Sequence, residues 1–349
     1  MSAIRILFLS DTHLGFDMPF RPRIQRRRRG PEFFANFKRV LDDAVARGVD
    51  GVIHGGDLFY RSKVPQRLVE MAFKPMKAVA DAGIPVFIVP GNHERSRIPH
   101  SEFSIHPNIY VFTRPRTFCL KAKGRTLALS GIPFVRKNIR RHFKHLVAQT
   151  GWSRQAADCR MLCLHQSVEG ATVGPSGYVF RRGEDVIRGR DIPSVFSAVL
   201  SGHIHRFQVL KRDLHGTPLA SPVFYSGAID RISFAERDEV KGYLVFNIEQ
   251  GIENGTSKLI WNFHQLPTRT MAILKLEPGP IGKKAFATLL SDRLGKLPND
   301  AIVKIKILGR ISDEQLTVLR ADVLRAIAPS TMNVTANLVD HHSIRFRSN

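Results

Sequence analysis

The sequence has few cysteines and no long apolar run. Its three cysteines, Cys119, Cys159 and Cys163, are an odd number among 349 residues and lack zinc-finger spacing. We therefore expect reduced thiols in a cytosolic protein, associated with the nucleoid if the source is bacterial. The apolar stretches fall short of the roughly 20 residues that a membrane span needs, so no membrane contact is expected. Residues 1–10 predict a core strand instead of a signal peptide.

Negative charge is also scarce. Against 53 Lys and Arg stand 30 Asp and Glu, which gives a formal net charge of +23. Hydrophobic residues make up 43% of the chain, a globular composition and not a disordered one. Of the net charge, +18 lies in the first 270 residues and +5 in the rest. An excess of this size predicts a polyanionic partner.

One segment concentrates the positive charge. Six arginines occur within nine positions, just before a sequence typical of a helix start at 31–34. Two interpretations are open: contact with a phosphate backbone, or a solvated loop without a partner. We assign phosphate contact to these arginines and to one that follows a later histidine motif: Arg21, Arg23, Arg26, Arg27, Arg28, Arg29 and Arg206.

The early chain alternates strands and helices, which is typical of a buried and mainly parallel sheet. The expected strands are 6–9, 52–53 and 86–89, and the expected helices are 32–47 and 65–82, the latter kinked at Pro75. Later β-rich runs predict a second sheet packed on the first in an α/β sandwich. These runs are 125–130, 160–164, 197–201, 207–212, 223–226, 242–248 and 257–264.

The pattern resets near Leu266-Pro267. The C-terminal part of the sequence predicts strands at 271–276, 303–307 and 333–339 and a helix at 283–294. A capping box that begins at Ser312 predicts the start of a second helix, which continues to Ala328. We expect two domains, 1–266 and 267–349, of which the second is a small independent unit.

Five short polar clusters each follow an apolar strand. In open α/β sheets functional side chains converge at the carboxyl ends of the strands, and a D-x-H or H-x-H pair in extended backbone points to one side. Any one cluster alone is weak, and most single histidines are packed or hydrogen-bonded. The conjunction of five predicts a set of metal ligands: Asp11, His13, Asp57, Asn92, His165, His203 and His205.

The chemistry of this set indicates the kind of metal. Carboxylate, amide and imidazole ligands together suit Mn, Fe or Zn better than Mg or Ca. Seven ligands exceed the needs of one ion and suit two divalent ions with a bridging carboxylate. Asp57, central in the series, is the candidate bridge.

The order D-x-H, GD, GNH[DE], H, GHxH over residues 11–205 resembles the calcineurin-like metallophosphoesterases. Further segments are similar to the SbcD-type DNA repair nucleases over about residues 4–250. These segments are 9–15 (LSDTHLG), 56–59 (GDLF), 164–166 (LHQ), 202–206 (GHIHR), 225–231 (YSGAIDR) and 239–243 (EVKGY).

The resemblance implies a four-layer α/β/β/α sandwich as the metallophosphoesterase (nuclease) domain, 1–266, followed by a small α+β capping and DNA-binding domain, 267–349. It implies a two-manganese nuclease that acts on DNA ends in double-strand-break repair. It also implies homodimerisation and an SMC-like coiled-coil ATPase partner of SbcC type. It places Asp11, His13, Asp57 and His205 on one metal, and Asp57, Asn92, His165 and His203 on the other. His93 is then the catalytic histidine beside the scissile phosphate, which stabilises or protonates the leaving oxygen.

Two departures from the family pattern bear on these expectations. Some relatives have a histidine three residues after the bridging aspartate, where this chain has Tyr60. The sequence ends at Asn349, where family members often continue into helices that grip the ATPase, so that partnership is less expected than nuclease activity.

Two other hypotheses stay open. One is a phosphatase or cyclic-nucleotide phosphodiesterase of the same fold, and the other is a non-catalytic DNA-end-binding scaffold that retains a vestigial site. Binding of DNA should depend steeply on salt concentration, because many phosphates are neutralised, whereas binding of a small substrate should not.

Overall fold

The computed structural model describes residues 3–18, 27–94, 103, 105–250 and 257–338. The chain divides into two compact units. The N-terminal unit comprises Met1–Phe20 and Arg29–Pro267, and the C-terminal unit comprises Arg21–Arg28 and Thr268–Asn349. In the described parts of the chain, no helix is long and apolar enough to cross a membrane.

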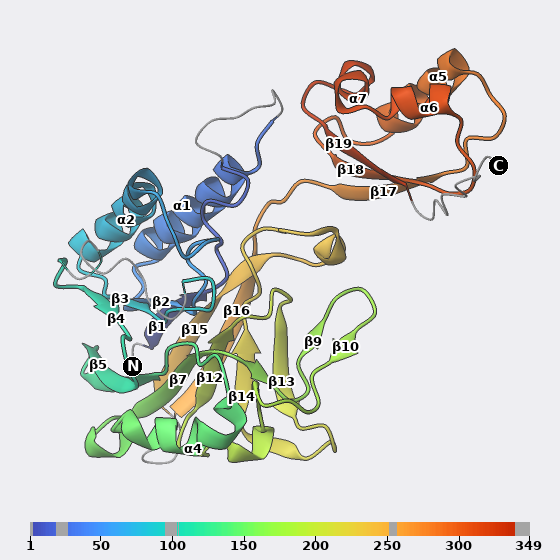
Figure 1. Ribbon diagram of the computed structural model, residues 1–349. Helices are drawn as coiled ribbons and strands as arrows, with labels where there is room; N and C mark the ends of the chain where they lie inside the picture. The colour runs from blue at the N-terminus through green and yellow to red at the C-terminus, as the bar shows by residue number, and fades with distance from the viewer. Residues whose placement is uncertain (1–2, 19–26, 95–102, 104, 251–256, 339–349) are drawn as a thin grey trace. The chain divides into compact units, whose positions relative to one another are not determined.

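The first sheet of the N-terminal unit has the strand order β16-β15-β1-β2-β3-β4 (Figure 1). Strands β1 to β4 are parallel, whereas β15 pairs antiparallel with β1 through Ile6 and Phe246. The segments 242–248 and 257–264, expected in the second sheet, therefore belong to the first. The bounds are β1 Ile4–Leu9, β2 Gly51–His54, β3 Val86–Ile88, β4 Ile109–Val111, β15 Gly242–Gln250 and β16 Ser257–Gln265.

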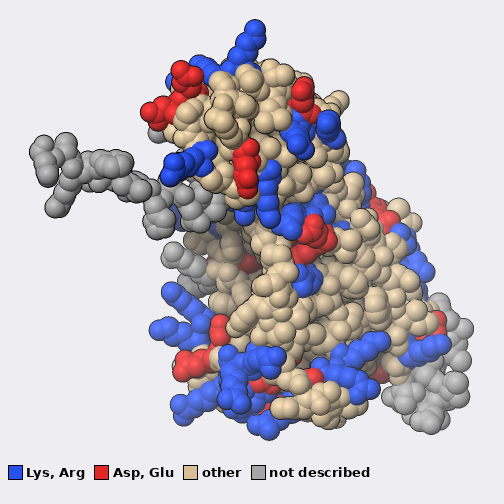
Figure 2. Space-filling view, turned by 90° about the vertical axis from the view of Figure 1, so that its right-hand side faces the viewer, with Lys and Arg blue, Asp and Glu red and all other residues tan. Residues whose placement is uncertain are grey.

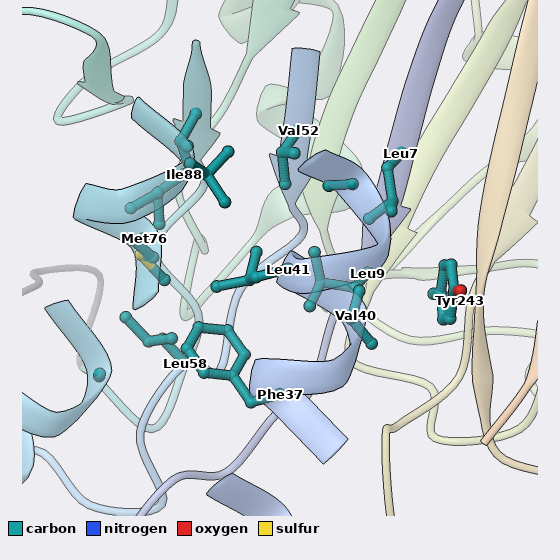
Figure 3. Packing of buried hydrophobic residues seen from close by; sticks show 14 of the residues in the cluster. Leu7, Leu9, Phe37, Val40, Leu41, Val52, Leu58, Met76, Ile88 and Tyr243 are labelled. Carbon is teal, nitrogen blue, oxygen red and sulfur yellow. The ribbon is translucent and has the colours of Figure 1, made fainter. Parts of the chain in front are cut away.

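Two helices cover the outer face of this sheet, α1 Gly30–Ala46 and α2 Gln66–Asp81. Phe37 and Leu41 of α1 are buried against Leu7, Val52 and other strand residues (Figure 3). Pro31 near the start of α1 has a fixed φ that suits the first turn of a helix. Pro75 lies inside α2, and the helix continues through it to Asp81. Both helices agree with the apolar spacing of the sequence.

The second sheet has the order β13-β14-β12-β7-β6-β5, with β6, β7, β12 and β14 parallel. Its inner face packs on the first sheet through Leu129, Met161 and Leu200. Its outer face packs on α4, Ile139–Gln149, a helix that the sequence analysis missed. The strands are β5 Arg116–Ala122, β6 Arg125–Gly131, β7 Cys159–His165, β12 Ala198–Gly202, β13 Gln208–Arg212 and β14 Pro218–Tyr225.

The layers of the N-terminal unit are thus α1 and α2, the first sheet, the second sheet, and α4. This arrangement confirms the expected α/β/β/α sandwich. Four two-residue strands form small pairs at the side of the second sheet: β8 Ser167–Val168 with β11 Val186–Ile187, and β9 Thr172–Val173 with β10 Tyr178–Val179.

The C-terminal unit holds a three-stranded parallel sheet in the order β17-β18-β19, with its helices on one side (Figure 1). The capping box at Ser312 forms as predicted: its side chain accepts from Gln315 N, and the Gln315 side chain accepts from Ser312 N. The helix predicted up to Ala328 is instead two, because the backbone of Arg320 is extended. The bounds are β17 Met271–Leu276, α5 Lys283–Gly295, β18 Ile302–Ile307, α6 Asp313–Val318, α7 Ala321–Ile327 and β19 Asn333–Leu338.

Candidate metal centre

All seven predicted ligands lie at the carboxyl ends of parallel strands, and those strands come from both sheets. Asp11 follows β1, Asp57 follows β2 and Asn92 follows β3, whereas His165 ends β7 and His203 follows β12. Since the two sheets pack face to face, their strand ends bring these side chains to one edge of the sandwich.

Asp11, His13 and His205 form what we call the first ligand group. The Nε2 atoms of His13 and His205 are 2.9 Å apart, and His205 Nε2 is 3.8 Å from Asp11 Oδ1. Asp57 Oδ2 lies 4.0 Å from His13 Nε2. Three donor atoms, one from each member of the group, lie within 4.8 Å of one another, which is close enough to hold one metal ion.

Asn92, His165 and His203 form the second ligand group. Asn92 Oδ1 is 3.0 Å from His165 Nε2 and 2.9 Å from His203 Nδ1. Asp57 Oδ2 is 3.4 Å from His165 Nε2, so this carboxylate lies between the two groups. On the far side of its ring, His165 Nδ1 donates to the carbonyl of Gly55 at 2.8 Å, which fixes the ring's orientation.

The backbone at the centre has an unusual conformation. Asp11, His13, Asp57 and His203 have φ values of 51°, 43°, 53° and 80°, in the left-handed region that side chains rarely adopt. Such conformations persist only where the surrounding structure holds them, and they concentrate at functional sites. Gly91 lies so close to Asp57 that a Cβ there would overlap its carboxylate. Glycine at this position lets the third strand end approach the second.

The buried histidines of the centre differ in the direction in which their pKa values are shifted. Burial and the neighbouring imidazoles lower the pKa of His13 well below its usual range and that of His203 to about 3. Burial would also lower the pKa of His165, but the charge of Asp57 outweighs it and raises the pKa to about 9. At neutral pH the neutral rings offer a lone pair, and His165 carries a proton in the absence of a cation.

The two carboxylates differ in the same way. Burial raises the pKa of Asp11, because little solvent remains to stabilise its charge. Burial acts in the same direction on Asp57, but His165 and His13 outweigh it and lower the pKa of Asp57 below its usual range. Asp57 is therefore the ionised carboxylate around which the imidazoles gather.

The residues present fit divalent cations. In both groups, potential ligand atoms lie within hydrogen-bond distance of one another: two imidazole Nε2 atoms in the first group, and two imidazole nitrogens around the Asn92 amide oxygen in the second. Such pairs need a proton or a cation between them. His13 Nδ1 is also buried without a hydrogen-bond partner in the described residues. A mixed set of imidazole, carboxylate and amide donors suits Mn, Fe or Zn.

His93 lies beside these groups, with 30% of its side chain exposed. Its Nδ1 is 2.7 Å from the carbonyl of Tyr60, and its Nε2 is 3.8 Å from Asp57 Oδ2. The backbone N–H of His93 donates to Asp57 Oδ1 at 2.9 Å. His13, Asp57 and His93 also lie close enough together to hold an ion, so geometry alone leaves His93 two roles. Tyr60, noted above as a departure from the family pattern, orients His93 through its main chain.

Sequence reasoning missed an ionic cluster behind His205. Glu236 Oε1 is 3.4 Å from His205 Nδ1, and its Oε2 is 2.6 Å from the fully buried Lys241 Nζ. Lys241 Nζ also donates to the His205 carbonyl at 2.8 Å and to Glu239 Oε2 at 3.0 Å. The signal was present in the resemblance at 239–243, but no strand-end pattern marks Glu236.

Glu94 was also missed as a positioning residue. It is buried, and its two carboxylate oxygens accept from the backbone N–H groups of Phe59 at 2.7 Å and Gly91 at 2.8 Å. Burial and nearby Asp57 raise the pKa of Glu94 to about 8. Glu94 thereby ties the loop that carries Asp57 to the loop that carries Asn92.

The predicted DNA-binding arginines do not share one environment. Arg29 is 7% exposed and contacts Asp230 Oδ1 at 3.2 Å and the Arg231 carbonyl at 2.6 Å, so its assignment to DNA does not fit its burial. Arg206 is bound to Glu239 Oε1 at 3.1 Å and to the Gly174 carbonyl at 2.6 Å. Arg27 and Arg28 belong to the C-terminal unit. The remaining predicted positions, Arg21, Arg23 and Arg26, lie outside the described residues.

Comparison with known proteins gives consistent matches. The family profile described as calcineurin-like phosphoesterase matches residues 4–207. The DNA double-strand break repair protein Mre11 of Sulfurisphaera tokodaii is 28% identical over 224 residues, covering 61% of this chain and 52% of that protein. The protein of the same name from Saccharolobus solfataricus is 26% identical, covering 70% and 58%. That from Halobacterium salinarum is 27% identical, covering 87% and 70%. The chain thus spans less than two thirds of the first two relatives.

Proposed function

Since the chain belongs to the calcineurin-like phosphoesterases, we propose that it is a metal-dependent DNA nuclease of the SbcD and Mre11 type. The observation that carries the proposal is the convergence of two ligand groups on Asp57, at one edge of the sandwich. Two adjacent cation sites that share a carboxylate are the arrangement that phosphodiester hydrolysis uses.

The proposed centre assigns a task to each residue. Asp11, His13, Asp57 and His205 hold one divalent ion, and Asp57, Asn92, His165 and His203 hold the other, with Mn²⁺ expected and Fe or Zn as alternatives. Bound ions lower the pKa of a water and neutralise phosphate oxygens. The fold orients the ligands before a metal ion binds. His165 is held by the Gly55 carbonyl, and His205 lies beside Glu236.

His93 is proposed as the group that handles the leaving oxygen. Its Nδ1 donates to the Tyr60 carbonyl, so Nε2 is the atom that can carry or release a second proton. That atom lies next to Asp57 on a partly exposed side chain, where a bound phosphodiester can reach it. A proton given by Nε2 to the leaving 3′-oxygen prevents the build-up of alkoxide charge as the bond breaks.

Charge favours DNA as the substrate. The net charge of +23 suits a polyanion, and Figure 2 shows lysine and arginine side chains gathered over the lower part of one face of the N-terminal unit. Two thirds or more of the chain aligns with two of the relatives whose names specify DNA double-strand break repair. The proposal includes a homodimer and an SMC-like coiled-coil ATPase partner of SbcC type.

The proposal is tested with the purified chain, Mn²⁺ and no ATP. We expect cleavage of end-labelled linear duplex or of closed circular single strands, and loss of cleavage when a chelator removes the metal. Products from the linear substrate alone would indicate an exonuclease, and products from the circle an endonuclease. Intact DNA together with hydrolysis of p-nitrophenyl phosphate or a cyclic nucleotide would favour the phosphatase or phosphodiesterase hypothesis. DNA binding without hydrolysis of any ester would favour the scaffold hypothesis.

A further inference from the structure

Arg29 is the member of the arginine run that the proposed function does not use. Its side chain is buried at the start of α1, where a DNA phosphate does not reach it. Burial of a guanidinium is costly unless its charge and its N–H groups find partners. Nη2 of Arg29 donates to Asp230 Oδ1 at 3.2 Å and to the Arg231 carbonyl at 2.6 Å. The Arg29 side chain therefore belongs to the interior of the N-terminal unit, and its role must lie there.

Two aromatic rings complete the surroundings of Arg29. Its Cζ lies 5.5 Å from the centre of the Phe16 ring and 5.7 Å from that of the Phe33 ring, distances at which a cation and a π face attract each other. The main-chain N–H of Arg29 also donates to Asp17 Oδ2 at 2.9 Å. Arg29 thus holds Phe16 and Asp17, which follow the ligand His13 closely in the chain, against the start of α1.

Phe16 extends this series of contacts to His93 through Tyr60. The Phe16 and Tyr60 rings meet edge to face with their centres 5.1 Å apart, and the centre of the Tyr60 ring lies 5.6 Å from that of His93. The Tyr60 carbonyl accepts from His93 Nδ1 at 2.7 Å, and the Tyr60 N–H donates to the Leu14 carbonyl at 3.0 Å. Continuous contacts therefore join Arg29 to the proposed leaving-group histidine.

We propose that Arg29 is a positioning residue for His93 and acts through the rings of Phe16 and Tyr60. The inference rests on the proposed function, because it concerns how the leaving-group histidine is held. A hydrogen bond at Nδ1 leaves the partly exposed His93 ring free to tilt about that bond, and the packed Tyr60 ring limits the tilt. Displacement of a catalytic group by about 1 Å can lower a rate about 10²-fold, so this limit matters for turnover.

The leaving group of the substrate separates this role from a general loss of stability. The alkoxide oxygen of DNA or of thymidylyl-thymidine needs a proton as it leaves, whereas p-nitrophenolate leaves without one. We expect Arg29→Gln to lower turnover of DNA and of the dinucleoside about tenfold or more, and that of the p-nitrophenyl ester of thymidylate by less than about twofold. The Mn²⁺ stoichiometry, measured by calorimetric titration, should stay as in the wild-type chain.

The control is Arg39→Gln, which removes the same charge from an exposed position on α1 and should hydrolyse all three substrates at the wild-type rate. If Arg29→Gln folds poorly, Phe16→Leu takes its place, because it removes the aromatic contact and leaves the Arg29–Asp230 pair. It should show the same dependence on the leaving group. In the His93→Gln background, Arg29→Gln should have little further effect on DNA cleavage, since residues that act through one group are not additive. Equal losses on all substrates, or additive losses in the double variant, would overturn the proposal.

Failure of this inference is separable from failure of the proposed function. If the wild-type chain cleaves DNA and Arg29→Gln loses all substrates equally, the nuclease stands and the positioning role is rejected. If the wild-type chain cleaves the two small esters but not DNA, the nuclease is rejected, and a loss confined to the dinucleoside supports the positioning role. NMR of the histidine ring nitrogens decides without catalysis. In Arg29→Gln the His93 signal should shift, whereas that of His106, which contacts Asp81, should not; an unshifted His93 signal rejects the role.

Discussion

The two ligand groups reach the same edge of the sandwich but are held in place by different means. In the second group, His165 is completely buried and is oriented by a main-chain carbonyl, that of Gly55. In the first group, 22% of the His205 side chain is exposed, and charged side chains lie behind it, Glu236 next to the ring and Lys241 next to Glu236.

This difference has a consequence for metal binding. A buried main-chain carbonyl, such as that of Gly55 just after β2, is a fixed acceptor that substitution does not remove. A carboxylate can be neutralised without a change of shape, so the first group is sensitive to substitutions outside its own ligands. We therefore expect the two sites to be separable by mutation, with Asp57 as the residue that both require.

The largest effect is expected for Asp57→Asn. Asparagine keeps the size of the side chain and tolerates the left-handed backbone, so the change removes mainly charge. We expect binding of both ions to fail and hydrolysis to fall by at least about 10³-fold, since several kcal/mol of charge stabilisation are lost. Calorimetric titration with Mn²⁺ and a DNA cleavage assay measure the two losses. One retained high-affinity site would contradict a shared role for Asp57.

His93→Gln is expected to separate turnover from metal binding. The amide fills similar space but cannot transfer a proton, so hydrolysis should fall by about 10²-fold or more. The Mn²⁺ stoichiometry should stay as in the wild-type chain, which the same titration measures. Wild-type turnover would rule out the leaving-group role, and loss of an ion would make His93 a ligand instead.

The metal-free chain should lose stability as the pH rises, because His165 loses its proton. The pKa of His165 is raised to about 9 in the folded protein, against an ordinary value of 6.5. Its contribution to stability is therefore complete below pH 6.5 and is lost as the pH rises through 9. The free energy of unfolding of the wild-type chain relative to His165→Gln should fall by about 3 kcal/mol across this interval.

Urea unfolding in chelator, repeated between pH 6 and 9.5, measures this difference. His54→Gln is the matched control, because His54 is also buried in the centre of the fold and its pKa is lowered to about 3. Its own effect should be constant above about pH 7.5 and should change only below that, in the opposite direction to the effect of His165, because His54 then takes up a proton in the unfolded chain alone. A constant effect for His165→Gln as well would show that Asp57 does not hold a proton on His165.

The smallest effect is expected for Glu236→Gln. Loss of the charge beside His205 Nδ1 should weaken one Mn²⁺ site about tenfold and leave the other unchanged, which a two-site titration resolves. Asp238→Asn, an exposed carboxylate two residues away, provides the control and should leave both sites unchanged. Equal weakening of both sites would mean that the two groups are not supported independently.

The sequence predicted what is local in this fold. Strand-end polar clusters follow from a few consecutive residues, so Asp11, His13, Asp57, Asn92, His165, His203 and His205 could all be selected, and the structure brings them together. The capping box at Ser312 is equally local, since its hydrogen bonds join residues three apart.

Features that depend on contacts between residues far apart in the sequence were not predicted. Strand β15 joins the first sheet beside β1, more than 230 residues earlier in the chain, and no local pattern specifies that partner. Arg29 resembles the other arginines of the segment 21–29 in sequence, but it is buried and its side chain contacts Asp230. Helix α4 was missed although Ile139, Phe143 and Val147 recur at helical spacing, because basic and polar residues surround them.

The left-handed backbone at Asp11, His13, Asp57 and His203 restricts the amino acids that evolution can place there. Asparagine, aspartate, histidine and glycine tolerate this conformation best, whereas β-branched and bulky residues do not. Three of those four residue types supply oxygen or nitrogen ligands. Conformation and coordination thus select overlapping amino acids at four positions, and saturation mutagenesis read out by folding alone should recover much of the ligand pattern without any metal present.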